Sequence, residues 1–336
     1  MTASAEHAPA QPSVQRGRLP DFFIVGHAKC GTTALWEALR RHPQIYLPRI
    51  KEPWFFARDN PHPQQTRERS IAYTGKRTET MNEYLSLFAP ARADQLIGEA
   101  STSYLWSPTA AERIAAAQPR ARIIAILREP ASFLRSLHLQ LLSNNNESQK
   151  DFRKAIELEP LRREGREIPR YAFWPRTLMY SDRVRYVEQL RRYHAVFPRE
   201  QVLVLIYDDF RADNEGTLGQ VLRFLGVGET YPLAIADVNP TRRVRSVRLS
   251  HLTRVLKHGR GPVSGAINAT VKRMLSRPAR KAFLWPLQRR LVYGAPKPAD
   301  EEFMLELRRR FKPEVEALSD YLGRDLVAHW GYDRLG

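Results

Sequence analysis

The sequence predicts an α/β protein in which helices cover both faces of a mostly parallel central sheet. Three apolar runs have no polar alternation and predict buried strands: DFFIV at 21–25, RIIAIL at 122–127 and QVLVLIYDDF at 201–210. A segment with helical spacing of apolar residues follows each run. Continuous apolar strands that alternate with helices are typical of a three-layer α/β/α fold.

The helices after these runs are predicted from leucine spacing and from their ends. The first covers TTALWEALRRH and stops at His42-Pro43, the second carries Leu134 to Leu142, and the third ends at Gly226. Residues 96–108 add a short strand and a turn, and 180–196 form an amphipathic helix. A closing helix over 301–330 is expected to pack on the core through five apolar residues, namely Leu305, Phe311, Val315, Leu318 and Leu322.

The length and composition favour one domain. The chain has 336 residues, of which 43% are hydrophobic, so it can bury a sizeable core. Residues 1–18 lack an apolar segment and predict a disordered tail rather than a signal peptide. The single domain therefore spans 19–336, with a basic amphipathic insertion at about 241–299.

The positive charge is concentrated in that insertion. The chain has a formal charge of +18, and fifteen Lys or Arg residues but no acidic residue lie between Asp237 and Asp300. Such a segment suits an anionic partner. Its few aromatic residues argue against nucleic acid, whereas Leu, Phe and Trp mixed with Arg favour peripheral contact with an acidic membrane through 250–295.

Two further features bear on location. Cys30 is the single cysteine, so no internal disulfide can form, which suits a reducing compartment. No apolar run approaches the ~18 residues of a membrane-spanning helix. We therefore expect a cytoplasmic protein, with peripheral membrane contact through the basic segment.

The stretch VGHAKCGTT, residues 25–33, has the spacing of a phosphate-binding loop. Gly26 and Gly31 keep the four-residue interval of a nucleotide loop, but Thr32 occupies the position of the usual lysine, and the lysine is at position 29. Between a strand and a helix, backbone N–H groups and the helix dipole favour an anion. The fold is therefore predicted to be of the P-loop type, and the alternative is a turn with incidental glycines.

A kinase or NTPase that uses Mg-ATP is the alternative enzyme. It requires an acidic Mg²⁺ ligand at the end of a buried strand. RIIAIL ends instead at Arg128, whose guanidinium suits a phosphate. Asp208 and Asp209 follow the third strand and could bind a metal, but a helix N-cap and a surface charge are the preferred interpretation.

Three motifs resemble those of sulfotransferases that use 3'-phosphoadenosine 5'-phosphosulfate (PAPS), in the bacterial and heparan-sulfate-like branch. FFIVGHAKCGTTALWEALRRHPQI resembles their 5'-phosphosulfate loop, RIIAILREPASFLRSLH their 3'-phosphate motif, and KEPWFF their catalytic segment. The resemblance covers most of 21–240 and resumes near LGRDLVAHW. It implies in-line transfer of a sulfo group to a hydroxyl, or as a second choice an amine, of a glycan, glycolipid or small natural product.

The resemblance also implies the site residues. Lys29, Cys30, Gly31, Thr32 and Thr33 bind the 5' group, partly through backbone N–H groups. The 3'-phosphate is bound by Arg128 and Ser136, and one or more of Arg242, Arg243 and Arg245 closes on the donor. Glu52 is the catalytic base and Lys29 stabilises the leaving phosphate, so no metal is required.

The acceptor region departs from the family pattern. Members of the heparan type commonly have GEK where this chain has GEAS, so Ala100 replaces a lysine. Glu99 and Ser101 are candidates for shaping the acceptor cleft. The aromatic group Trp54, Phe55 and Phe56 could line the cleft, although core packing is an equal alternative for the two phenylalanines. His138 is a weak candidate for acceptor contact.

Overall fold

The computed structural model describes residues 17–57, 78–169, 172, 174–228, 243–244, 293–294 and 298–335. Five strands form a sheet in the order β2-β3-β1-β4-β5, and every neighbouring pair is parallel. The strands are β1 (Phe22–Ile24), β2 (Ile45–Tyr46), β3 (Leu96–Ala100), β4 (Arg122–Leu127) and β5 (Val202–Ile206). The predicted parallel sheet is confirmed.

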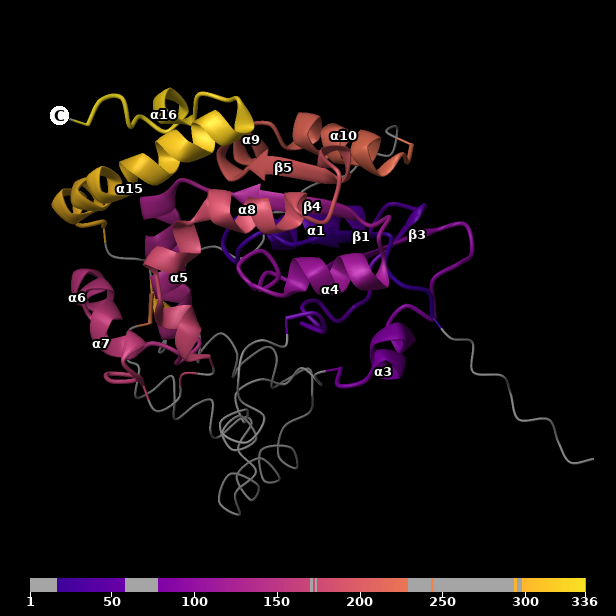
Figure 1. Ribbon diagram of the computed structural model, residues 1–336, viewed down its shortest axis with the longest axis horizontal. Helices are drawn as coiled ribbons and strands as arrows, with labels where there is room; N and C mark the ends of the chain where they lie inside the picture. Colours follow the sequence, from indigo (N-terminus) through magenta and orange to yellow (C-terminus); the bar gives the residue numbers. More distant parts are fainter. Residues whose placement is uncertain are drawn as a thin grey trace, which may run out of the picture.

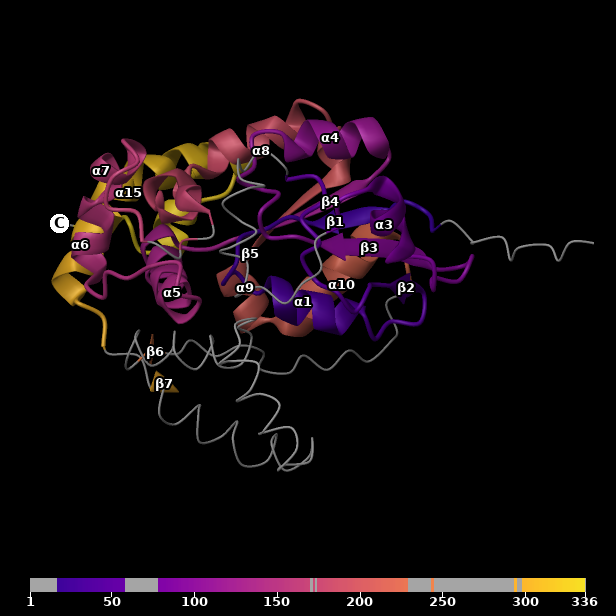
Figure 2. The same ribbon diagram turned by 90° about the horizontal axis from the view of Figure 1, so that it is seen from below.

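Helices cover both faces of this sheet. One face carries α1 (Thr32–Leu39) and α10 (Asn214–Leu225), and the other carries α4 (Ala110–Ala117) and α8 (Tyr186–His194), as the two views in Figures 1 and 2 show. Both faces of the central strands are thereby buried, which explains why β1 and β4 read as continuous apolar runs. The predicted three-layer α/β/α fold is confirmed.

The topology brings distant loops to one edge of the sheet. β1 lies between β3 and β4, with Ile24 opposite both Ala100 and Ile124. All five strands run the same way, so the segments that follow β1, β3 and β4 leave from the same edge. Beyond that edge lie α5 (Pro130–Ser143), α6 (Phe152–Glu157) and α7 (Glu159–Arg163) (Figure 1). Ligands of parallel sheets bind at this edge.

Two sequence predictions were too long. The third strand ends at Ile206, because its ladder with β4 ends at the pair Leu127 and Ile206, and α9 (Tyr207–Ala212) begins there. Two aspartates in the first turn of α9 interact favourably with the helix dipole. The helix predicted over 180–196 divides into a 3-10 turn at Ser181–Val184 and α8, because Arg185 has ψ of 62° and leaves the helical region.

The closing helix is α15 (Glu301–Leu322), followed by α16 (Leu326–His329) after a left-handed Gly323. The buried stripe of α15 runs through Phe303, Met304, Leu307, Phe311, Val315 and Leu318. Leu322 is half-buried and packs against the core as predicted, whereas Leu305 is half-buried and lies outside the core cluster, so its predicted place is wrong. Leu305 lies two positions from Phe303 and from Leu307, which turns it away from the face that packs on the core.

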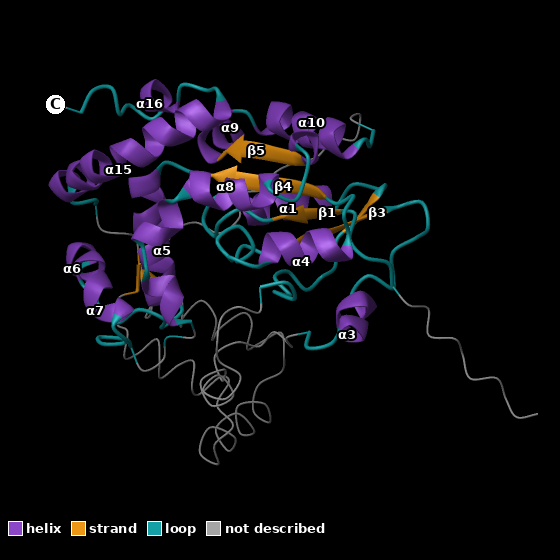
Figure 3. Cartoon of the chain, viewed as in Figure 1, coloured by secondary structure: helices purple, strands orange, loops and turns teal. Residues whose placement is uncertain are grey.

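The remaining described elements are short. Helix α3 (Met81–Ser86) begins with a capping box between Thr80 and Glu83. Strands β6 (Arg243–Val244) and β7 (Tyr293–Gly294), labelled in Figure 2, pair in antiparallel fashion. Figure 3 colours the described helices and strands by type. Most of the tail at 1–18 and of the insertion at 241–299 lies outside the described residues. Within the described part, no helix is long and apolar enough to cross a membrane.

Candidate functional site

The loop between β1 and α1 has the backbone of an anion site. Lys29 and Gly31 both have positive φ, 69° and 86°, and Gly31 precedes the first residue of α1. A Cβ on Gly26 would lie 2.6 Å from the Ile126 amide nitrogen, so this position requires glycine for the close approach of β4. No side chain caps α1, and its first N–H groups are therefore available to an anion.

Side chains in this loop divide into those at the surface of the site and those in the core. Lys29 is half-buried, and burial followed by the charge of Arg128 lowers its pKa. Thr33 is half-buried at the start of α1, whereas Thr32 is buried. Cys30 lies in the core, its amide donates to the His27 carbonyl at 3.3 Å, and burial raises its thiol pKa to about 12. The Cys30 thiol is therefore not available to contact a donor bound at this loop.

The two predicted nucleotide motifs meet at Arg128. Its Nη1 donates to the Lys29 carbonyl oxygen at 2.9 Å, and its guanidinium lies 4.6 Å from the Tyr207 ring centroid. Among the described residues Arg128 makes no ion pair. Its neighbour Glu129 accepts from two amides at the start of α5 and from the Tyr332 hydroxyl, and lies 3.7 Å from Arg308 Nε. Ser136 is buried on α5, two turns along.

Glu52 lies in a strained turn held by the end of β3. Its amide donates to the Ala100 carbonyl at 2.9 Å, and both Glu52 and Trp54 have positive φ, 64° and 54°. Non-glycine residues adopt this conformation at a cost of order 1–3 kcal/mol each, and such residues cluster at functional sites. The Trp54 amide donates to Ser101 Oγ at 3.2 Å, which fixes the second half of the turn.

The Glu52 carboxylate is oriented by three donors. Lys51 Nζ donates to Oε1 at 2.8 Å, and Trp54 Nε1 and Thr102 Oγ1 donate to Oε2 at 3.2 and 3.1 Å. The side chain keeps 22% of its surface exposed. A carboxylate that is oriented and still accessible can accept a proton from a bound hydroxyl.

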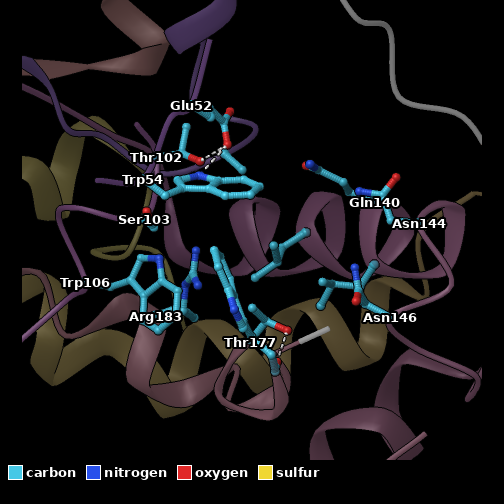
Figure 4. Close-up of a pocket in the computed structure, with 14 residues that line it drawn as sticks. Glu52, Trp54, Thr102, Ser103, Trp106, Gln140, Asn144, Asn146, Thr177 and Arg183 are labelled. Carbon is cyan, nitrogen blue, oxygen red and sulfur yellow. Dashed lines mark hydrogen bonds between the residues drawn. The ribbon is translucent and has the colours of Figure 1, made fainter. Parts of the chain in front are cut away.

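This carboxylate lines a pocket that also reaches the loop after β1. Ala28 of the loop and Glu52 both line it, together with Thr102, Ser103 and the indoles of Trp54, Trp106 and Trp174 (Figure 4). We call this the Glu52 pocket. Amides from the end of α5 and the following turn, Gln140, Asn144 and Asn146, complete the side opposite Trp106. An indole-lined pocket with convergent amides suits a small polar ligand with apolar faces.

Sequence reasoning missed most of the residues that line this pocket. Trp106 and Trp174 lie 68 positions apart and come together with Trp54 in one cluster of buried indoles. Arg183 also lines the pocket, but the sequence hides it among 54 Lys and Arg residues. The scarcity of tryptophan, six in the whole chain, was the one signal that could have singled out the indoles.

Glu99 and His138 do not line the Glu52 pocket. Glu99 is fully buried behind it, where its carboxylate accepts from Ser101 Oγ at 2.5 Å and from the hydroxyls of Tyr84 and Tyr104. It therefore acts on the Glu52 turn through Ser101. His138 is buried against Tyr180, with its Nδ1 3.0 Å from the hydroxyl.

The aromatic group after Glu52 divides in two. Trp54 lines the pocket, whereas Phe55 and Phe56 pack in the core. Phe55 stacks on Tyr84, with ring centroids 4.4 Å apart. The alternative of core packing is therefore right for both phenylalanines.

Asp208 and Asp209 have structural partners. Trp330 Nε1 donates to Asp208 at 3.0 Å, and Arg324 makes a two-point ion pair with Asp209 at 2.5 and 2.8 Å. These contacts fasten the C-terminal segment to α9. The N-cap of α9 is Ile206 and no side chain caps this helix, so the predicted N-cap role of an aspartate is wrong. Within the described ranges, no group of three or more His, Cys, Asp or Glu residues is placed to bind a metal ion.

Of the three arginines predicted to close on the donor, the structure describes only the backbone of Arg243. Arg242 and Arg245 lie outside the described residues, as does most of 250–295. Arg243 contributes backbone to β6, which lies beside α5. Their predicted contact with the donor stays a prediction.

A parallel α/β sheet with an uncapped loop-to-helix turn and a carboxylate-lined pocket at one edge is the arrangement in which α/β proteins bind nucleotides. The chain belongs to the sulfotransferase family, whose model matches residues 20–230.

Relatives and a solved structure agree with this assignment. Mouse carbohydrate sulfotransferase 15 is 30% identical over 255 residues, which cover 62% of this chain and 44% of that protein. Human bifunctional heparan sulfate N-deacetylase/N-sulfotransferase 3 is 29% identical over 219 residues, covering 62% and 22%. The crystal structure of a sulfotransferase from Alicyclobacillus acidocaldarius has a TM-score of 0.61 at 26% identity, covering 93% of this chain and 98% of that one. The chain spans less than half the length of these two curated relatives.

Proposed function

We propose that the protein transfers a sulfo group from PAPS to a hydroxyl group of a carbohydrate-like acceptor. The observation that carries the proposal is that Glu52 and Ala28 line the same pocket. The pocket therefore joins an oriented carboxylate to the loop with the backbone of an anion site. The alternatives are an amine in place of the hydroxyl group, and a glycolipid or a small natural product in place of the carbohydrate.

The residues present fit a donor with two separate anionic groups. The uncapped start of α1, with Lys29, Gly31, Thr32 and Thr33, would bind the 5'-phosphosulfate. Arg128 and Ser136, on the segment that begins α5, would bind the 3'-phosphate. The hydrogen bond from Arg128 to the Lys29 carbonyl supports the pairing of these sites, because it fixes one relative to the other.

Glu52 and Lys29 would divide the chemistry. The acceptor oxygen forms a bond to sulfur while the bond between sulfur and the bridging oxygen breaks, and adenosine 3',5'-bisphosphate leaves. Glu52 accepts the proton of the acceptor hydroxyl, and the Lys29 ammonium stabilises the charge that develops on the leaving phosphate. Donors from Lys51, Trp54 and Thr102 keep the Glu52 carboxylate turned into position.

The names of the relatives support a carbohydrate acceptor, as do the indoles of the Glu52 pocket. The two curated relatives are named for carbohydrate and heparan sulfate. Indole faces pack well on the apolar faces of sugar rings, and amide groups pair with their hydroxyls. The three tryptophans and the three amides of the pocket supply both kinds of contact.

Calorimetry with two nucleotides tests the proposal. Adenosine 3',5'-bisphosphate in the presence of EDTA should bind to one site, and Mg-ATP should bind far more weakly. Tight binding of Mg-ATP alone would replace the proposal with the kinase interpretation. The aspartates that this interpretation requires already pair with Arg324 and Trp330, so the structure does not favour it.

A further inference from the structure

Arg183 is a buried cation in the Glu52 pocket. Its side chain lines the pocket, its relative exposure is 4%, and its guanidinium lies 4.2 Å from the Trp106 ring centroid. Among the described residues it has no ion-pair partner, and its buried Nε has no hydrogen-bond partner. Arginine is almost never fully buried without a partner, because the loss of hydration is costly. An unpaired guanidinium in a pocket therefore indicates an anionic ligand.

The guanidinium is held in place by a neutral histidine. Gln189 Nε2 donates to the carbonyls of Asp182 and Arg183, at 3.0 and 3.3 Å, so its Oε1 faces His27. His27 Nε2 lies 2.7 Å from this oxygen and must be the protonated nitrogen. Nδ1 then has a free lone pair, which accepts a hydrogen bond from Arg183 Nη2 at 3.3 Å.

The histidine supplies no charge to this arrangement. Burial first, and then the charge of Arg183, keeps the pKa of His27 well below its ordinary value. The ring is therefore neutral near pH 7 and serves only to orient the guanidinium. Burial lowers the pKa of Arg183 to about 9, so the guanidinium stays charged at neutral pH. Arg176, which lies 5.5 Å from the Trp106 ring centroid, adds further positive charge on this side of the pocket.

The position of Arg183 separates it from the proposed chemistry. In Figure 4 the Trp54 ring is drawn between the Glu52 carboxylate and the Arg183 guanidinium. Lys29 and Arg128 already provide cations at the donor loop. A ligand that reaches Arg183 must therefore extend along the indoles, away from the hydroxyl that faces Glu52. An acceptor in the pocket can do so, even though the pocket meets the loop at Ala28 and Arg183 itself donates to His27 of the loop.

We propose that Arg183 binds a carboxylate or sulfate group of the acceptor, so that the acceptor is an acidic carbohydrate. This inference rests on the proposed sulfo transfer and assigns Arg183 as a specificity-determining residue. The planar guanidinium fork matches an oxyanion in two-point geometry. Acidic sugars gain affinity from that contact, and neutral sugars of the same shape leave the buried cation without a partner.

Matched acceptors test the inference. The turnover of PAPS with unsulfated chondroitin hexasaccharide is compared with that of its carboxyl-reduced form, in wild type, Arg183→Gln and Arg183→Lys. Wild type should prefer the acidic acceptor, and Arg183→Gln should lower its kcat/KM by about 10- to 100-fold. The kcat/KM for the carboxyl-reduced acceptor should change less than about twofold. Arg183→Lys keeps the charge but not the planar fork, so its kcat/KM for the acidic acceptor should fall between those of wild type and Arg183→Gln. Activity of Arg183→Lys would also show that the protein folds when Arg183 is replaced.

The remaining outcomes each decide the question. Equal losses on both acceptors would overturn the inference and place Arg183 at the donor's sulfo group or in folding. If neither hexasaccharide is turned over, tryptophan fluorescence of the bisphosphate complex is titrated with methyl glucuronide and methyl glucoside. Selective binding of the glucuronide supports the inference, and its absence overturns it. Bisphosphate binding is measured separately by calorimetry. Failure of the proposed function can therefore be distinguished from failure of the inference about Arg183.

Arg185→Gln is the matched control. Arg185 lies two residues from Arg183, is exposed and pairs with Glu188 at 3.4 Å. Exposed ion pairs of this kind contribute little, so this variant should keep the wild-type preference for the acidic acceptor.

Discussion

Arg128 Nη1 donates to the carbonyl oxygen of Lys29 at 2.9 Å, across 99 positions of the chain. This contact joins the end of β4 to the loop after β1. It places a guanidinium that makes no ion pair within the described residues beside the start of α1. The donor site we propose depends on this hydrogen bond.

Replacing Arg128 should weaken donor binding. A hydrogen bond to a charged group contributes about 1.5–3 kcal/mol, so Arg128→Ala should reduce bisphosphate affinity by about 10- to 100-fold. Calorimetry measures the affinity, and Arg120→Ala, on the exposed surface before β4, is the control. Unchanged affinity in Arg128→Ala would remove Arg128 from the donor site.

Replacing Glu52 should affect turnover and not binding. Glu52→Gln keeps the shape and the acceptor oxygen but cannot take a proton at neutral pH, so kcat should fall by about 10²- to 10⁴-fold. Bisphosphate affinity should stay within about twofold, because the carboxylate is not placed at the donor loop. Glu112→Gln, on the exposed side of α4, should match wild type. A fully active Glu52→Gln enzyme would exclude Glu52 as the base.

Glu99 should make stability depend on pH. Burial, opposed by the hydrogen bonds from Ser101, Tyr84 and Tyr104, raises the pKa of Glu99 from 4.5 to about 7. Between these values the folded state binds a proton that the unfolded state has lost, so this carboxyl makes stability fall as pH rises from about 5 to 7. Above pH 7 its contribution is constant.

Urea denaturation midpoints at pH 5, 6, 7 and 8 measure this effect. Glu99→Gln has no titrating group at position 99, so its denaturation midpoint should fall less steeply than that of wild type between pH 5 and 7. Glu112→Gln should keep the wild-type slope. Parallel curves for wild type and Glu99→Gln would show that Glu99 titrates in its ordinary range.

Asp209 should be structural. Its hydrogen bonds from Arg324 lower its pKa, so the stabilisation it provides is lost as pH falls through the carboxyl range. Both partners are more than a third exposed, so Asp209→Asn should cost less than about 1 kcal/mol of the free energy of unfolding. Bisphosphate binding should be unchanged. A magnesium-dependent loss of nucleotide binding in Asp209→Asn would instead revive the kinase interpretation.

The basic segment should bring the protein to acidic membranes. The intact protein should cosediment with vesicles of phosphatidylserine and phosphatidylcholine at low salt, and much less at high salt, since exposed charges are screened. Pure phosphatidylcholine vesicles are the control. Equal sedimentation with both vesicle types would contradict the prediction.

The sequence predicted the sheet well because its strands are buried on both sides. Continuous apolar runs such as 122–127 have few alternatives to a covered parallel strand, and β4 has those same bounds. The end of β5 was missed, because the sequence does not show that the ladder with β4 stops at Ile206. Leu305 was placed on the wrong face for a similar reason, since the choice between two nearby apolar stripes depends on what the helix packs against.

The strand, loop and helix at 21–39 could be predicted, but the Glu52 pocket could not. Lys29 and Gly31 are close in sequence, and their spacing alone indicates a phosphate loop. By contrast, Trp54, Trp106 and Trp174 lie 52 and 68 positions apart and meet only in the folded chain. The role of Glu99 depends on its burial behind Ser101, which spacing does not disclose.

The transfer of labelled sulfate measures the proposed sulfo transfer itself. The protein is incubated with PAPS labelled at sulfur, a carbohydrate acceptor extract and EDTA, and the label is followed into the acceptor. We predict metal-independent transfer by the wild-type protein, loss of that transfer in Glu52→Gln, and bisphosphate binding by both. Absence of transfer by a wild-type protein that binds Mg-ATP, or equal transfer by Glu52→Gln, would contradict this prediction.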